Sequence, residues 1–451
     1  MLDSEFKDKD VVIMGLGYVG LTLGAYLAEL GFKVHGVEIR DLVLNALESR
    51  KSFFWEPGLD DLLVRNIENG NFSFSGTIPK VKSNRVFVIT VGTPIDKHKK
   101  AILDSITNVS NQVSQAMIDG DMVILRSTVK LNTTNSIVAP ILKKSGKDFD
   151  LAFCPERTLE GAALEELGSL PQIVGAGSQR SRARAINFFQ QITSSVVNVS
   201  NIETAEMIKL VDNMQRDVFF AVSNEVAHLC NTQQIKASEV ISAGKLGYKR
   251  TNLANPGPVG GPCLEKDSYL LAESVGDTPA NARIALAARL TNESVTTEAA
   301  EFISDWVKRH TDETKLKISV LGMAFKGIPE TNDMRGTPAI ALIDSLVSYC
   351  PNSEILCWDP VITVDEMQLF GYKSTLDLQE CIEGSSVIIL VNNHPDLSSL
   401  DLKSIFSSAK KPILIYDFWG RSDQGLTLEG LGQYFSWGNH FIIDQSKEIT
   451  N

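Results

Sequence analysis

The sequence predicts an α/β protein made of two doubly wound domains, each built on a parallel sheet, with a helical domain between them. Short apolar runs alternate with helical periodicity in the first part of the chain and again near its C-terminus, whereas long helical periodicity dominates the middle. A chain of 451 residues is long enough for this division. We expect domains at residues 1–200, 201–312 and 313–451.

Apolar runs in the first domain predict six strands, and a glycine-rich turn with a helix follows the first of them. The runs are residues 10–14, 32–38, 85–91, 121–126, 151–153 and 172–174. The turn is expected over residues 15–20 and the helix over residues 21–30, closed by Gly31. Another helix is expected over residues 102–118.

The middle domain is expected to contain two long helices, at residues 202–230 and 280–307, with a loop rich in Gly, Pro and Asn at residues 252–262. After a charged linker, four apolar runs predict the strands of the last domain: residues 318–321, 354–358, 386–391 and 412–416. The first of these runs ends at Gly322, much as the first run of the chain ends at Gly15, but without the further glycines.

Acidic residues outnumber basic ones, 55 against 43, and the formal net charge is −12. Nonspecific nucleic-acid binding needs the opposite charge, so no nucleic-acid partner is expected. The six cysteines are scattered, with no C-x-x-C and no Cys/His zinc spacing, which indicates reduced thiols in a cytoplasmic protein and no metal site. The uncharged stretch 11–28 is interrupted by four glycines, so we expect a strand, turn and helix there and no membrane segment.

The glycine pattern Gly15-x-Gly17-x-x-Gly20 follows the first predicted strand and opens a helix. Its three glycines would allow a tight turn, a close approach of a pyrophosphate and close helix packing, with free N–H groups at the helix N-terminus. Glu38 ends the second predicted strand, where a carboxylate holds ribose hydroxyls and repels a 2′-phosphate. The pattern favours a Rossmann-like fold that binds NAD rather than NADP, a preference that Arg40 slightly weakens; the alternative is a structural glycine turn.

Lys209 and Asn213 lie four residues apart on a predicted helix and therefore share a face. A lysine and an amide aimed into a site could stabilise an oxyanion. The alternative is a surface ion pair between Glu206 and Lys209, with Asn213 in solvent or capping a helix.

Cys263 follows Gly260 and Gly261 and precedes Asp267 by four residues. The glycines would let a substrate approach the backbone, the cysteine could attack a carbonyl carbon, and the aspartate could direct a proton or a water. A buried structural thiol is the alternative.

Two further segments follow predicted strands. Ser127 and Thr128 lie at a strand end, where α/β sites gather, although such a hydroxyl also serves as a helix cap. Glu156 and Glu160 lie four residues apart in the next loop, which could equally be an acidic loop before a helix.

Eight motifs in this order resemble the UDP-glucose/GDP-mannose dehydrogenase family over nearly the whole chain. They are GLGYVG (15–20), EPGL (56–59), STV (127–129), PERTLEG (155–161), AEMIKLVDN (205–213), GGPCLEKD (260–267), LGMAFKG (321–327) and DMRGTPA (333–339). The resemblance implies a cytoplasmic homodimer that oxidises the C6 alcohol of a nucleotide sugar to a uronic acid with two NAD molecules, for surface polysaccharide biosynthesis.

The resemblance also assigns roles to residues. Cys263 is implied as the nucleophile that forms a thiohemiacetal and then a thioester. Lys209 and Asn213 would stabilise oxyanions, and Asp267 and Thr128 would position the water. Glu156 and Glu160 match the acidic residues of the family's loop, with Glu160 as candidate general base. The implied NAD contacts are Gly15, Gly17, Tyr18, Val19, Gly20, Glu38, Thr93, Ser127, Thr128 and Arg335. The implied substrate contacts are Arg157, Arg250, Gly260, Gly261, Lys326 and Arg421, with Arg250 reaching across a dimer.

The dipeptide Glu156-Arg157 resembles the UDP-N-acetylhexosamine branch of the family, so UDP-N-acetylmannosamine or UDP-N-acetylglucosamine is the expected substrate. UDP-glucose ranks next and GDP-mannose lower. Two other classes stay open: a two-electron hydroxyacid-type dehydrogenase, which would not need Cys263, and a non-catalytic nucleotide-sugar binder, which would release no NADH.

Overall fold

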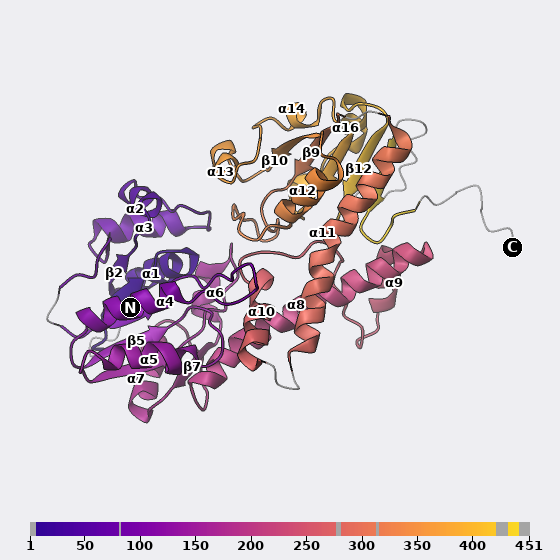
Figure 1. Ribbon diagram of the computed structural model, residues 1–451. Helices are drawn as coiled ribbons and strands as arrows, with labels where there is room; N and C mark the ends of the chain where they lie inside the picture. Colours follow the sequence, from indigo (N-terminus) through magenta and orange to yellow (C-terminus); the bar gives the residue numbers. More distant parts are fainter. Residues whose placement is uncertain (1–5, 81–82, 277–280, 313–314, 421–431, 442–451) are drawn as a thin grey trace. The chain divides into compact units, whose positions relative to one another are not determined.

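A computed structural model describes residues 6–80, 83–276, 281–312, 315–420 and 432–441 (Figure 1). The chain forms two compact units. The first unit comprises Met1–Met214 and Lys266–Ala282, and the second comprises Gln215–Glu265 and Arg283–Asn451. Within the described ranges, no helix is both long and apolar enough to cross a membrane.

The first unit contains an eight-stranded sheet in the order β3-β2-β1-β4-β5-β6-β7-β8. The strands are β1 (Asp10–Met14), β2 (Lys33–Val37), β3 (Phe72–Ser75), β4 (Val86–Ile89), β5 (Asp121–Leu125), β6 (Phe149–Phe153), β7 (Gln172–Ala176) and β8 (Val196–Asn198). All six predicted strands are present, while β3 and β8 were not predicted. The expectation of a wholly parallel sheet is wrong at one place, because β6 and β7 pair antiparallel.

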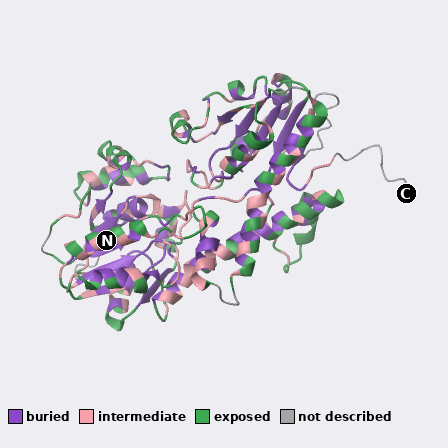
Figure 2. Ribbon diagram, viewed as in Figure 1, coloured by how far each residue is buried: buried purple, intermediate pink, exposed green. Residues whose placement is uncertain are grey.

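Helices cover both faces of this sheet. They are α1 (Tyr18–Leu30), α2 (Asp41–Glu48), α3 (Leu59–Glu68), α4 (Asp104–Ala116), the π-helix η1 (Thr134–Val138), α5 (Ala139–Lys143), α6 (Ala163–Ser169) and α7 (Gln179–Phe189). Side chains alternate across each strand, so Val11 and Ile13 of β1 enter one apolar cluster and Val12 and Met14 the other. Figure 2 shows the strands buried and the outer helix faces exposed.

Helix α1 begins earlier than predicted, at Tyr18 rather than residue 21. The turn is shorter because Gly20 already lies inside the helix, packed against the carbonyl oxygen of Gly15. The predicted end is confirmed: Gly31 has a φ of 100° and its N–H returns to Ala28 and Leu27.

The second unit contains a five-stranded parallel sheet in the order β10-β9-β11-β12-β13. The strands are β9 (Lys317–Leu321), β10 (Glu354–Trp358), β11 (Val387–Leu390), β12 (Ile413–Asp417) and β13 (Gly432–Ser436). The first four match the predicted runs, and β13 was not predicted. Its helices are α12 (Pro338–Tyr349), α13 (Val364–Leu369), α14 (Leu378–Ile382), α15 (Pro395–Ser398) and α16 (Leu402–Ser408).

Four further helices are α8 (Ile202–Gln233), α9 (Ala237–Lys245), α10 (Leu264–Val275) and α11 (Arg283–His310). The predicted helices at 202–230 and 280–307 correspond to α8 and α11, although residue 280 itself lies outside the described residues. The predicted loop at 252–262 has no regular structure until the turn at its end. Together with the two sheets, these helices confirm the predicted fold class.

The two sheets begin in the same way. Gly15 and Gly322 have φ of 97° and 94°, and their N–H groups donate to the carbonyls of Val37 and Trp358 on the neighbouring strands, at 2.8 and 2.9 Å. A carboxylate follows each neighbouring strand: Glu38 in the first unit and Asp359 in the second. The predicted similarity between the two strand ends is therefore present in three dimensions.

Candidate functional site

The glycine turn between β1 and α1 leaves an open cradle at a helix N-terminus. A Cβ on Gly15 would lie 2.9 Å from Val91 Cγ1, and one on Gly20 would lie 1.9 Å from the Gly15 carbonyl oxygen. Over Gly17, by contrast, nothing lies nearer than an Arg40 nitrogen at 3.9 Å. Gly17 is the N-cap and no side chain caps the helix. The first N–H groups of α1 thus face a space that fits the pyrophosphate of a dinucleotide.

Glu38 follows β2 beside this cradle, in the position predicted for a ribose-binding carboxylate. One of its oxygens accepts the N–H of Leu16 at 3.0 Å, which fixes the turn. The other accepts the N–H groups of Ile39 and Arg40, and the Arg40 guanidinium pairs with both oxygens. Burial pushes the pKa of Glu38 upward, but Arg40 and the backbone donors outweigh it and hold the pKa below its ordinary value.

Three predicted motifs meet at Tyr18. Its hydroxyl donates to Glu56 of the EPGL motif, and the N–H of Gly161 in PERTLEG donates to the Tyr18 oxygen at 2.7 Å and to Glu56 at 2.8 Å. Burial, followed by the Glu56 carboxylate, raises the pKa of Tyr18. Because its side chain joins these loops, a cofactor contact of Tyr18 would come from its backbone N–H. Sequence reasoning gave Glu56 no role, although its motif had been recognised.

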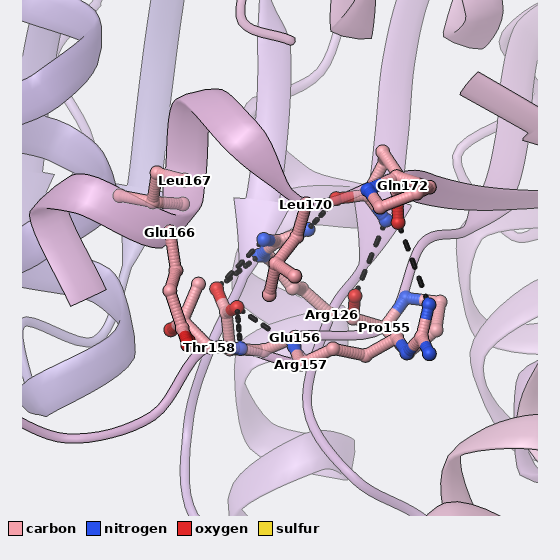
Figure 3. A pocket seen from close by; sticks show the side chains of 10 residues that line it. Arg126, Pro155, Glu156, Arg157, Thr158, Glu166, Leu167, Leu170 and Gln172 are labelled. Atoms are coloured by element: carbon pink, nitrogen blue, oxygen red, sulfur yellow. Dashed lines mark hydrogen bonds and ion pairs between the residues drawn. The ribbon is translucent and has the colours of Figure 1, made fainter. Parts of the chain in front are cut away.

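A buried ion pair holds the loop after β6. Arg126 donates to Glu156 Oε2 from Nε and Nη2, at 3.0 and 2.7 Å, and to Gln172 at 2.8 Å (Figure 3). The other Glu156 oxygen accepts the N–H groups of Arg157 and Thr158. Burial would raise the pKa of Glu156, but the Arg126 charge and these donors lower it. Both oxygens are therefore engaged in shaping the loop, a geometry that does not favour the predicted catalytic part of Glu156.

Arg157 and Glu160 lie further along the same loop. Arg157 pairs with Asp212 of α8 at 2.9 Å and keeps a third of its side chain exposed. Glu160 is half-buried, and its charge contributes to the raised pKa of Tyr18. The loop thus carries an arginine in a partly exposed ion pair, and a carboxylate whose charge acts on Tyr18.

Asn213 and Asp267 are in direct contact, as expected if both belong to one site. Asn213 Nδ2 donates to Asp267 Oδ2 at 2.5 Å, and Lys266 donates to the other oxygen at 2.7 Å. Both residues are buried. Lys209, one helical turn before Asn213, is half-buried. Two motifs 54 residues apart in sequence therefore place an amide and a carboxylate together.

The surface-pair alternative for Lys209 is wrong. Glu206 is completely buried and accepts the N–H groups of Asn132 and Thr134 and the Thr134 hydroxyl. Burial raises its pKa above the ordinary value. Glu206 therefore anchors the loop before η1 instead of pairing with Lys209, and Asn213 is not in solvent.

The end of α10 is attached to loops at the carboxyl edge of the first sheet. Glu273 accepts from the N–H of Ala101 and from Lys130, both at 2.7 Å, and the Ser274 hydroxyl accepts the Leu131 N–H at 2.8 Å. These contacts fix the helix that carries Asp267 relative to the segment just after STV. Within the first unit, α10 is therefore held near its start by the bond between Asn213 and Asp267 and near its end by these contacts of Glu273 and Ser274.

Two strand-end loops also meet in the first unit. The Thr93 hydroxyl donates to the Thr128 carbonyl at 2.5 Å, and the Ser127 hydroxyl donates to the Ile89 carbonyl at 3.3 Å. Thr128 is half-buried and caps none of the described helices, the nearest of which starts at Thr134. The helix-cap alternative for Thr128 is thus wrong.

In the second unit, Cys263 is exposed and directly precedes α10, so the alternative of a buried thiol is wrong. The flanking glycines have a role that the sequence did not indicate. The Gly261 N–H donates to the Gly336 carbonyl at 2.7 Å. A Cβ on Gly260 would lie 2.2 Å from the same carbonyl oxygen, and one on Gly261 would lie 2.6 Å from the Phe325 ring. They admit a close approach of the protein's own chain.

Arg289 of α11 holds both sides of the cysteine loop. It is buried and donates to the carbonyls of Val259 at 3.0 Å and Leu264 at 2.9 Å. Its guanidinium also lies 3.2 Å from Asp217, which is equally buried. This residue was not predicted, because nothing near it in sequence marks it.

The other predicted residues have local partners. The Arg250 guanidinium lies over the Tyr248 ring at 4.9 Å, and Lys326 lies over Phe325 at 5.4 Å. Arg335 pairs with Asp333 at 2.6 Å and is half-exposed. Arg421 lies outside the described residues. No cluster of three or more His, Cys, Asp or Glu side chains suited to a metal occurs in the part of the chain that the structure describes.

Comparison with known proteins gives consistent matches along the chain. Sequence models of the UDP-glucose/GDP-mannose dehydrogenase family match in three parts: the NAD-binding domain at residues 9–193, the central domain at 203–294 and the UDP-binding domain at 319–424. UDP-N-acetyl-D-mannosamine dehydrogenase of Methanococcus aeolicus is 30% identical over 95% of this chain and 96% of its own length.

Solved structures agree with these sequence matches. The UDP-D-ManNAc dehydrogenase of Pyrococcus horikoshii superposes with a TM-score of 0.84 at 27% identity, covering 96% of this chain and 99% of that chain. The UDP-N-acetyl-mannosamine dehydrogenase of Staphylococcus aureus gives a TM-score of 0.79 at 25% identity, covering 95% of this chain and 98% of that chain.

Proposed function

Because this chain belongs to the UDP-glucose/GDP-mannose dehydrogenase family, we propose that it oxidises the C6 hydroxyl of UDP-N-acetylmannosamine to the carboxylate. The chain is an NAD-dependent nucleotide-sugar dehydrogenase, with a UDP-binding domain at residues 319–424. The names of the relatives above support this sugar, as does Arg157 in PERTLEG. UDP-N-acetylglucosamine and then UDP-glucose are the next candidates, and the product would serve surface polysaccharide biosynthesis.

One observation carries the chemical part of the proposal: Cys263 is an exposed thiol in a loop whose backbone is fixed on both sides by the buried Arg289. A thiolate there adds to the C6 aldehyde and forms a thiohemiacetal, whose carbon still carries a hydride. Loss of that hydride gives a thioester. Water then adds to the thioester carbon, the C–S bond breaks, and the acid and free Cys263 result.

NAD, held by the glycine turn at residues 15–20 and by Glu38, would supply the hydride acceptor for both oxidations. We assign the stabilisation of the developing oxyanions to Lys209 and Asn213, because the amide is oriented by its bond to Asp267. Asp267 and Thr128 would position the hydrolytic water, and Glu160 would accept its proton. Glu156 would act through the shape of its loop.

The remaining contacts are proposals of the same kind. We assign NAD contacts to the glycine turn, Glu38, Thr93, Ser127 and Arg335, and nucleotide-sugar contacts to Lys326, Arg421 and the loop at Gly260 and Gly261.

We also propose three domains, divided near residues 200 and 312, and a homodimer in which Arg250 reaches the other subunit. In support, the helices of the second unit expose apolar side chains, among them Val222, Leu229 and Leu290 at 47%, 53% and 61%. A monomer seen by light scattering at micromolar protein would refute the dimer.

The test is NADH release from NAD and a panel of UDP-N-acetylmannosamine, UDP-N-acetylglucosamine, UDP-glucose and GDP-mannose. The proposal expects UDP-N-acetylmannosamine to have the highest kcat/KM and to give two NADH per sugar. Cys263→Ala should form no acid. One NADH per sugar, unchanged by Cys263→Ala, would favour the two-electron hydroxyacid-type reaction instead. No NADH with any sugar, despite NAD binding, would favour the non-catalytic binder.

A further inference from the structure

The carboxylate of Glu38 already accepts five hydrogen bonds within the protein, so a ribose hydroxyl that contacts it must share or displace one of these donors. Oε2 accepts from the Leu16 N–H at 3.0 Å and from Arg40 Nη2 at 2.8 Å. Oε1 accepts from the N–H groups of Ile39 and Arg40, at 2.9 and 3.0 Å, and from Arg40 Nε at 3.1 Å. Five donors thus share two oxygens, which offer about four lone pairs. The negative charge that would repel a 2′-phosphate is also paired with a guanidinium.

Arg40 is placed where the adenosine end of a dinucleotide would lie. Its Nη2 lies 3.9 Å from the position of a Cβ on Gly17, beside the open cradle at the start of α1. Its guanidinium lies over the Phe53 ring, 5.1 Å from the centroid, which holds the plane in a defined orientation. About half of the side chain is exposed, 51%.

The guanidinium keeps one edge for a ligand. Nε and Nη2 bind Glu38, whereas Nη1 has no acceptor among the described residues. A phosphate can accept from Nη1 and Nη2 together while Nε stays on Glu38, because the five N–H donors of arginine form a fixed fork. The N-terminus of α1 has no side-chain cap, and the positive end of its helix dipole attracts an anion.

We propose that Arg40 gives this site affinity for a 2′-phosphate, so that the protein binds NADP as well as NAD. A free glutamate at this position would select NAD strongly, because its oxygens would accept both ribose hydroxyls and repel the phosphate. Here Arg40 neutralises that glutamate and offers donors of its own. It is therefore the residue that sets the cofactor preference of this chain.

Isothermal titration with ADP-ribose and with 2′-phospho-ADP-ribose tests the proposal directly. In the wild type, the two Kd values should agree within about ten-fold. Arg40→Ala should weaken the 2′-phosphorylated ligand about ten-fold or more, the loss expected for charge-assisted hydrogen bonds, and change ADP-ribose binding less than about three-fold. Arg40→Lys should restore part of the loss.

Arg65→Ala is the matched control. It removes the same charge from the same unit, at an exposed pair with Glu29 of 3.1 Å, and should change neither Kd. Wild-type binding of the 2′-phosphorylated ligand that is about 100-fold weaker than that of ADP-ribose would overturn the proposal. Equal weakening of both ligands by Arg40→Ala would also overturn it. Neither ligand contains a nicotinamide or a uridine diphosphate sugar, so the outcome does not depend on which substrate the enzyme oxidises.

Discussion

The buried pair of Arg289 and Asp217 offers a sharp test of how the cysteine loop is held. Replacing Arg289 by Met keeps most of the apolar stem and removes the cation. The substitution leaves the Asp217 carboxylate buried without its guanidinium, 1% exposed, and removes the donors to the carbonyls of Val259 and Leu264. Both carbonyls flank Cys263, so stability and catalysis should change together.

The magnitude follows from the burial of the pair. Breaking a fully buried ion pair by removing one partner costs about 3–5 kcal/mol. Each carbonyl left without its donor would cost about 1–3 kcal/mol if it stayed dry. Water can reach an opened loop, so these costs do not add. We expect Arg289→Met to lower the free energy of unfolding of the second unit by about 3–5 kcal/mol, and to lower kcat at temperatures where the variant is still folded.

Urea denaturation and steady-state kinetics measure the two effects. Arg289→Met/Asp217→Asn should recover about half of the lost stability, because no charge is left buried, but it should not recover kcat. Lys308→Ala is the control on the same helix: Lys308 is exposed and lies 3.5 Å from Asp305, so its loss should cost less than about 1 kcal/mol. An Arg289→Met variant with wild-type stability and wild-type kcat would refute this account of the loop.

Three other substitutions test separate parts of the structure. Gly20→Val should abolish NAD binding in titration, because even a Cβ there would lie 1.9 Å from the Gly15 carbonyl oxygen; wild-type affinity would contradict the close packing of that turn. Arg126→Met should destabilise the first unit by about 3–5 kcal/mol at pH 7. Arg126 lowers the pKa of Glu156, so its stabilisation is present above the pKa that Glu156 has in the unfolded chain and is lost as the pH falls through the pKa that Glu156 has in the folded protein. The difference in urea midpoint between the wild type and Arg126→Met should therefore become smaller below about pH 4. Burial lowers the pKa of His440 to about 3 in the folded protein, whereas a histidine in the unfolded chain is protonated below about pH 6.5. The free energy of unfolding should therefore fall by up to about 1.4 kcal/mol per pH unit as the pH drops from about 6.5 toward 3. His440→Gln should flatten that slope in acid unfolding, and an unchanged slope would show that another group titrates.

The sequence predicted most of the fold because its signals are local. The apolar run at residues 10–14, the glycines after it and Gly31 each act through neighbours in the chain, and the structure has β1, the turn and the end of α1 where these predict them. Strand β13 was missed, and so was the antiparallel pairing of β6 and β7. Strand direction depends on long-range packing, which an apolar run does not encode.

The candidate site could be predicted only as far as motifs mark it. Asn213 and Asp267 were both singled out, and the structure brings them together. Arg126 and Arg289 were not given roles, because their partners Glu156 and Asp217 lie 30 and 72 positions away, and a lone arginine in a sequence usually indicates a solvated charge. The approach of the Phe325 ring to Gly261 could not be predicted, because Phe325 lies far from Gly261 in sequence.

The covalent intermediate on Cys263 is the central claim, and mass spectrometry of acid-quenched enzyme tests it most directly. The enzyme would be mixed with NAD and UDP-N-acetylmannosamine, quenched within one turnover and digested, and the peptide containing Cys263 would be weighed. The account predicts a uronyl thioester on that peptide, absent from Cys263→Ala and lost on treatment with hydroxylamine. Formation of two NADH per sugar with no adduct on Cys263 at any quench time would contradict it.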